Sequence, residues 1–122
     1  MRAPRRSRRA RPISVSVVRT VDELMQVFSL RAQIYVGEQA CPYREEFDGN
    51  DLAGATHLLA HDGHEPIATM RIRWFATFAK FERICVRPAY RGGQTASELV
   101  GVACEIAARK ASAITRYPWT VG

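Results

Sequence analysis

Residues 81–99, FERICVRPAYRGGQTASEL, combine features that could bind an anion. An apolar-rich strand runs into a short turn of arginine, proline and glycine, and this turn opens a helix. The first N–H groups of a helix have no partner within it, and they lie at the positive end of the helix dipole. Phosphate is the usual biological anion at such a position. The stretch therefore predicts a phosphate-binding turn.

Glu82 lies on the strand that leads into this turn, where it could act as a general base. A general base takes a proton from the reacting group in the transition state, and a carboxylate is one of the side chains that can do so. Glu82 could take the proton directly or through a water molecule. The alternative is an ion pair with Arg73 or Arg83. The sequence leaves both interpretations open.

Side chains alternate between the two faces of a strand, so the strand of Glu82 has two predicted faces. One face would carry Lys80, Glu82 and Ile84. The other would carry Phe81, Arg83 and Cys85.

Five of the 12 acidic residues lie within one predicted loop. They are Glu38, Glu45, Glu46, Asp48 and Asp51. A negative loop beside a ligand site would attract a cationic group such as an amine. The alternative is an ordinary solvated loop.

The three histidines and three cysteines do not stand at the spacings of metal ligands, so no metal is predicted. His57 lies on a strand that looks half-buried, and we expect it to be a hydrogen-bonded structural histidine rather than a base. His61 and His64 flank a turn and are expected at the surface.

The cysteines are Cys41, Cys85 and Cys104. Their odd number, their wide spacing and the lack of a signal peptide before them predict a reducing, cytoplasmic location. Cys85 and Cys104 fall in a strand and a helix, and we expect both to be small buried apolar residues rather than reactive thiols.

Hydrophobic periodicity and turn signals predict the elements that position these residues. Strands are expected over residues 13–19, 55–60, 66–75 and 77–86, with a hairpin turn at Asp62 and Gly63. Helices are expected over residues 23–36, after the candidate N-cap residues Thr20 and Asp22, and over residues 94–110. The apolar face of the second helix would carry Leu99, Val102, Ala103, Ile106 and Ala107. Residues 38–53 are expected to form a loop, and residues 113–117 a further strand. This order predicts an α+β fold.

The length of 122 residues suits one domain, and the net charge of +6 comes from its first residues. Residues 1–12 contain six arginines and no acid, whereas residues 13–122 contain 12 basic and 12 acidic residues. We therefore expect a disordered basic tail over residues 1–12 and a single domain over residues 13–122. Nucleic acid would be bound only through this tail. No apolar run approaches the length that crosses a membrane.

The strand, turn and helix resemble the cofactor motif of the GNAT N-acetyltransferase superfamily. The family has an arginine or glutamine and two small residues in the pattern Arg/Gln-x-x-Gly-x-Gly/Ala, and this chain has Arg91-Gly92-Gly93-Gln94-Thr95-Ala96. Upstream, the chain is similar to the ElaA-like branch. The similar residues are Arg31, Tyr35-Val36, Glu38-Gln39, Cys41-Pro42-Tyr43, Glu46, Asp48-Gly49, Asp51 and Thr56-His57-Leu58-Leu59.

The resemblance implies a mixed, mostly antiparallel central sheet flanked by helices, and an acyl-CoA such as acetyl-CoA as co-substrate. Backbone amides at Gly92, Gly93, Gln94, Thr95 and Ala96, with Arg91, would bind the pyrophosphate. The backbone of Ile84, Cys85 and Val86 would hold the pantetheine arm like an added strand. This needs a strand splayed from its neighbour, which a β-bulge can provide. The implied activity is acetyl transfer to a primary amine of a small molecule or a protein.

The chain departs from the family in two ways. Gln94 occupies a position where the family usually has glycine, which allows close backbone approach to phosphate. Only 12 residues follow Lys110, where the family continues with further strands and a helix. We therefore expect a chain truncated at its C-terminus, which either forms a homodimer over its exposed sheet edge or is weakly active. The alternative function is a degenerate domain that binds CoA or a partner without turnover.

Overall fold

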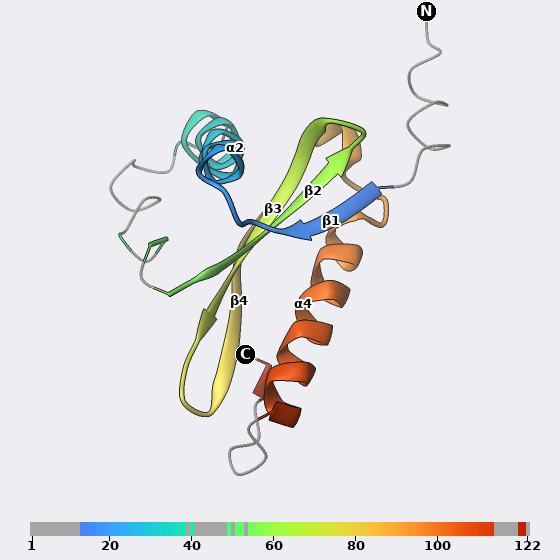
Figure 1. Cartoon of the computed structure of the whole chain (residues 1–122). Helices are drawn as coiled ribbons and strands as arrows, with labels where there is room; N and C mark the ends of the chain where they lie inside the picture. Colours follow the sequence, from blue (N-terminus) through green and yellow to red (C-terminus); the bar gives the residue numbers. More distant parts are fainter. Residues whose placement is uncertain are drawn as a thin grey trace, which may run out of the picture.

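The computed structural model describes residues 13–38, 40, 49, 51–52, 54–113 and 120–121 (Figure 1). The predicted tail over residues 1–12, Cys41, and the loop residues Glu45, Glu46 and Asp48 lie outside the described residues.

The described strands form one five-stranded sheet in the order β1-β2-β3-β4-β5. The strands are β1 (Ile13–Val17), β2 (Thr56–Asp62), β3 (Glu65–Trp74), β4 (Phe78–Val86) and β5 (Thr120–Val121). Neighbours are antiparallel except β4 and β5, which are parallel. The mixed, mostly antiparallel sheet is thus confirmed. The strand predicted over residues 113–117 is wrong at Ala113, which is helical, and residues 114–117 lie outside the described residues.

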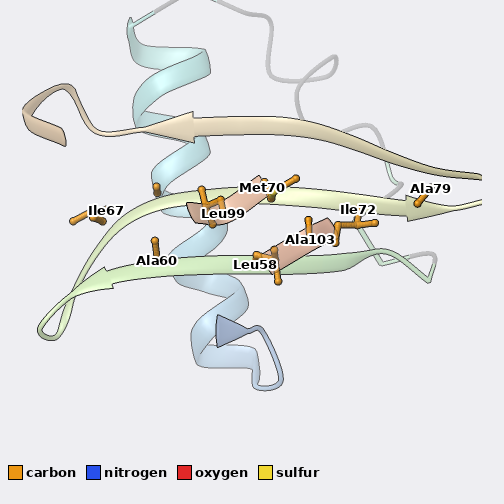
Figure 2. Packing of buried hydrophobic residues seen from close by; sticks show 9 residues of the cluster. Leu58, Ala60, Ile67, Met70, Ile72, Ala79, Leu99 and Ala103 are labelled. Atoms are coloured by element: carbon orange, nitrogen blue, oxygen red, sulfur yellow. The ribbon is translucent and has the colours of Figure 1, made fainter. Parts of the chain in front are cut away.

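Helices cover both faces of the sheet. On one face, α4 (Thr95–Ala113) places Leu99 and Ala103 over Leu58, Met70 and Ile72 of β2 and β3 (Figure 2). On the other face, α2 (Val21–Arg31) packs Val27 and Leu30 against Leu59 and Cys85. The apolar stripe predicted for the second helix is confirmed, because every member of it is buried or half-buried. No helix in the described part of the chain is both long and apolar enough to cross a membrane.

The two cysteines in described elements behave differently. Cys85 is 4% exposed and belongs to the core on the α2 face, as predicted. The burial predicted for Cys104 is wrong, because its side chain is exposed. The buried residues of α4 recur as Leu99, Ala103 and Ala107, four apart, and Cys104 lies one position beyond this stripe.

The first helical segment begins as predicted but changes its winding. Thr20 is the N-cap residue: its Oγ1 accepts from the N–H of Glu23, while the carboxylate of Glu23 accepts from the N–H of Thr20. After Arg31 the chain continues as a π-helix, η1 (Ala32–Glu38), where one regular α-helix was predicted. Such wider turns are frequent at functional sites. This one buries Ile34 and brings Tyr35 to the edge of β4.

A β-bulge interrupts the pairing of β3 with β4. Arg71 lies opposite Glu82, whereas Thr69 lies opposite Cys85, so β4 has one extra residue between these positions. Arg83 takes up the distortion with a positive φ of 54°. The bulge makes the predicted alternation wrong beyond Glu82, because Cys85 rather than Ile84 shares the face of Glu82. A β-bulge of the kind that could splay the strand, as the family resemblance requires, is present in β4.

Candidate active site

The edge of β4 is open next to the helix that follows it. Within the described residues, β5 pairs with β4 only at Phe78 and Ala79. Farther along, the Arg87 N–H donates to the carbonyl of Ile67 on β3, so the polar groups of Val86 point to the opposite, open side. Side chains from outside the sheet reach two carbonyls there. Tyr35 Oη donates to Ile84 O at 2.6 Å, and Arg91 Nε donates to Val86 O at 2.8 Å.

A cleft of about 220 Å³ lies along this open edge. Its lining consists of two residues of η1, three of β4 and one of the following turn, namely Ile34, Tyr35, Ile84, Cys85, Val86 and Arg91. Four of these six were predicted to bind the cofactor. Apolar side chains form much of its walls, and its polar groups include the β4 backbone carbonyls together with the Tyr35 hydroxyl and the Arg91 guanidinium. This combination suits an extended chain with amide groups better than a compact charged ligand.

The turn between β4 and α4 is anchored to the sheet and leads into the first turn of α4. It contains a short 3-10 helix, η2 (Pro88–Tyr90), and Tyr90 Oη donates to Asp62 Oδ2 at 2.6 Å, which anchors the turn to the β2–β3 hairpin. The first bond along α4 runs from Glu98 N–H to Gln94 O at 2.9 Å. The amides just before Glu98 therefore lack intrahelical partners, as at any helix start.

The structure resolves how the turn tolerates Gln94. Gly92 holds the left-handed conformation, with φ of 81°, and an added Cβ there would meet no atom within 4 Å. Gln94 has no positive φ, and its side chain is exposed. The left-handed residue of this turn is therefore Gly92, and position 94 does not need a glycine for its φ.

Glu82 is held by a cluster of cations on the α2 face. Its Oε2 accepts from Arg71 through both Nε, at 2.7 Å, and Nη2. Arg73 Nη1 lies 3.8 Å from the same oxygen, and Lys80 Nζ lies 3.4 Å from Oε1. Of the two pairings predicted, the structure shows the one with Arg73, but the principal partner is Arg71. Burial alone would raise the pKa of Glu82, yet the bonds and attraction from Arg71 and then Lys80 outweigh it and lower the pKa.

Arg71 also links Glu82 to a second carboxylate, Asp51. Asp51 Oδ1 accepts from Arg71 Nη1 at 3.0 Å and from Arg31 Nη1 at 2.5 Å. Both guanidinium groups are about 1% exposed. Buried charges persist only when they are paired in this way. The network therefore joins α2, the loop before β2, β3 and β4 beneath Glu82.

The acidic loop does not offer its described carboxylates to a cationic ligand. Glu38 Oε1 accepts from Arg91 Nη2 at 2.7 Å, and Asp51 is shared by two arginines. Both acids are thus neutralised by the protein itself. Neither acid is a free attractor for a cation, and of the two only Glu38 is exposed as the alternative of a solvated loop predicts.

His57 is a buried structural residue, as predicted. Its Nε2 lies 3.1 Å from Asp51 O, which can only accept, so Nε2 carries the proton. Burial lowers its pKa below the ordinary 6.5, against the opposing effect of Asp51. His61 Nε2 contacts Gln26 Oε1 at 2.9 Å and is half-buried, and His64 is exposed.

This lowered pKa predicts a pH-dependent stability. The unfolded chain protonates His57 below about pH 6.5, whereas the native state resists protonation, so stability is lost as the pH falls through this window. We expect the free energy of unfolding to decrease between about pH 7.5 and pH 5.5, and His57→Gln to lack that part of the decrease. Urea unfolding at several pH values measures it. An identical pH dependence in both proteins would contradict the assignment.

Three residues have contacts at the site that the sequence did not predict. Arg31 and Arg71 pair with the buried carboxylates, and Tyr35 donates to the β4 edge. The position of Arg71 opposite Glu82 depends on the pairing register of β3 and β4. This register could not be predicted, because the sequence does not show where the β-bulge lies. Tyr35 reaches a carbonyl 49 positions away, for which the sequence holds no local signal. Among the described residues, no group of three histidine, cysteine or acidic side chains could hold a metal ion.

Comparison with known proteins identifies the family of this chain. The sequence profile of the acetyltransferase (GNAT) family matches residues 22–121. This chain belongs to that family. Within the family, it is 31% identical over 75 residues to the N-acetyltransferase YjcF of Bacillus subtilis, covering 62% of this chain and 53% of YjcF. The chain spans about half the length of the curated relatives it matches.

Solved GNAT structures share the fold. Escherichia coli ElaA superimposes with a TM-score of 0.70 at 28% identity, covering 78% of this chain and 69% of ElaA. An acyl-CoA N-acyltransferase from Pseudomonas aeruginosa gives a TM-score of 0.73 at 28% identity, covering 80% of this chain and 72% of that protein. The family resemblance inferred from the turn and the upstream helix is thereby confirmed.

Proposed function

We propose that this protein is an acyl-CoA-dependent N-acyltransferase that moves an acetyl group from acetyl-CoA to a primary amine. The observation that carries the proposal is the open β4 edge at Ile84–Val86, which leads directly into the turn and the N-terminus of α4. An acyl-CoA has a diphosphate that joins a nucleotide to an extended arm with two amides. The turn suits the diphosphate and the cleft suits the arm.

The donor would be bound by backbone more than by side chains. The amides of Gly92, Gly93, Gln94, Thr95 and Ala96 would face the pyrophosphate, with the positive end of α4 behind them. The edge groups of Ile84 and Val86 would pair with the pantetheine arm. This requires Tyr35 and Arg91 to release the two carbonyls that they now occupy. Bond exchange of this kind costs little, because one hydrogen bond replaces another.

Glu82 is the base in this proposal. The pairing with Arg71 keeps the carboxylate ionised at neutral pH, which is the form that can accept a proton. A carboxylate of lowered pKa is a weak base, but the amine nitrogen becomes strongly acidic once it bonds to the acyl carbon, so a weak base suffices. The same contacts hold the carboxylate in one orientation.

Binding of CoA tests the donor assignment and separates it from the alternative of a degenerate domain. By calorimetry, we expect the natural chain to bind CoA and acetyl-CoA, and Gln94→Gly to change either dissociation constant by less than about threefold, because Gln94 adopts an ordinary φ. Gly92→Ala is the matched control. It should weaken binding by about tenfold, because alanine favours leaving the left-handed φ in the free chain and binding must restore it at a cost of roughly 1–2 kcal/mol.

Two outcomes would contradict the proposed function. Absence of binding by both the natural chain and Gln94→Gly would overturn the donor assignment. Binding by Gln94→Gly alone would show that the natural chain is the degenerate domain. The homodimer remains a prediction, which light scattering of the whole chain tests.

A further inference from the structure

Two cations, Arg73 and Lys80, lie beside Glu82 in addition to the arginines of the buried ion pairs. Arg31 and Arg71 are almost completely buried, and they contact the carboxylates of Asp51 and Glu82. Two buried positive charges thus meet two negative charges within about 3 Å. Arg73 and Lys80 add two further positive charges to the same face.

Arg73 and Lys80 face each other across β3 and β4. Their side chains are 29% and 51% exposed. In the part of the chain that the structure describes, the carboxylate within 4 Å of each is Glu82, which Arg71 already binds through two nitrogens. The Arg73 guanidinium also lies 5.2 Å from the ring centroid of Phe75, which restricts its position.

These cations lie on the side of Glu82 away from the cleft. The Arg73–Lys80 pair is two residues from the Arg71–Glu82 pair, a step of about 7 Å along the strands, and the cleft begins on the other side at Ile84. The hairpin end of β3 and β4 extends beyond α2 (Figure 1). The order along this face is therefore a cation pair, the proposed base and the proposed thioester site.

We propose that the acceptor is an amine that also carries a carboxylate, and that Arg73 and Lys80 bind this carboxylate. The inference rests on the proposed acyl transfer and names its substrate class. An exposed guanidinium beside an ammonium offers charge-assisted donors to a carboxylate. The same pair repels the second ammonium of a diamine. The Arg73–Lys80 pair lies one two-residue step of about 7 Å from the Arg71–Glu82 pair. An acceptor whose amine and carboxylate are about 7 Å apart could therefore contact Glu82 and the two cations at once.

Acceptors of equal length and opposite end charge test the proposal. Acetyl transfer from acetyl-CoA is measured with 6-aminohexanoate, 1,5-diaminopentane and hexylamine by release of the CoA thiol. We expect kcat/KM of the natural chain for 6-aminohexanoate to exceed that for the diamine at least tenfold. In the double variant Arg73→Gln/Lys80→Gln this ratio should fall below about threefold, because KM for 6-aminohexanoate rises. Arg109→Gln, which removes an exposed cation of α4, should leave the ratio unchanged.

The proposal is overturned if the diamine is the better acceptor of the natural chain, or if the double variant lowers kcat/KM equally for all three amines. A binding measurement separates it from the proposed function. Calorimetry with 6-acetamidohexanoate in the presence of CoA should show binding that the double variant weakens at least tenfold. If no amine is acetylated, the proposed activity fails. In that case loss of this binding in the double variant still supports the anion site, and absence of binding to the natural chain overturns it.

Discussion

Asp51→Asn is expected to lower the free energy of unfolding by about 3–5 kcal/mol, the range found when one partner of a buried ion pair is removed. Asp51 is 7% exposed, and one of its oxygens accepts from both Arg31 and Arg71. Asparagine keeps the shape of the side chain but removes the charge that the two buried guanidinium groups share. Urea unfolding of the whole chain at neutral pH measures the difference.

A surface ion pair supplies the matched control for this prediction. Glu105 lies 3.8 Å from Arg109 on α4, and both side chains are at least 70% exposed. Glu105→Gln also removes one carboxylate from an arginine, yet it should change the free energy of unfolding by less than about 0.5 kcal/mol, because solvent screens the pair. A loss of less than about 1 kcal/mol in Asp51→Asn would show that the buried network contributes little to the fold.

Glu82→Gln is expected to lower kcat by about 100- to 1000-fold, the contribution typical of a general base. Acetyl-CoA binding should be unchanged, because Glu82 does not line the cleft. The lowered pKa of Glu82 also places the acid limb of the pH–activity profile below the ordinary carboxyl value of 4.5, so its protonation should not limit activity near pH 7. Steady-state assays with acetyl-CoA and the best acceptor measure both effects.

The structural role of Glu82 makes a second readout necessary. Removing its charge also deprives Arg71 of a partner, so the variant is compared at a temperature where unfolding measurements show that it is folded. A folded variant that binds acetyl-CoA and keeps kcat within about threefold of the natural chain would rule out Glu82 as the base. It would leave the carboxylate with the ion-pairing role alone.

The strand, turn and helix around residues 81–99 could be predicted because their signals are local. Apolar periodicity identified β4 and the buried stripe of α4, and the Arg91-Gly92-Gly93 sequence marked the turn between them. Gly92 does adopt the left-handed conformation that only glycine takes without strain. The hairpin between β2 and β3 was predicted for the same reason, since Gly63 takes a positive φ there.

The face on which each β4 side chain lies could not be predicted. Alternation holds as far as Glu82, and then the bulge at Arg83 adds a residue and reverses it. Nothing in the local sequence marks this bulge, because arginine has no preference for a positive φ. The reversal places Cys85 in the core on the α2 face and leaves Ile84 at the exposed edge.

By itself, the sequence determined strands β1 to β4, the positions of the two helices and the turn that could bind a phosphate. Each of these depends on residues within a few positions of one another, whereas the mixed sheet was inferred through the family resemblance. Only the tertiary structure decided what surrounds the candidate site: Arg71 beneath Glu82, Tyr35 on the β4 edge, and Asp51 between two arginines. These contacts join residues up to 49 positions apart, and they form because packing α2 onto the sheet buries charges that must then find opposite charges.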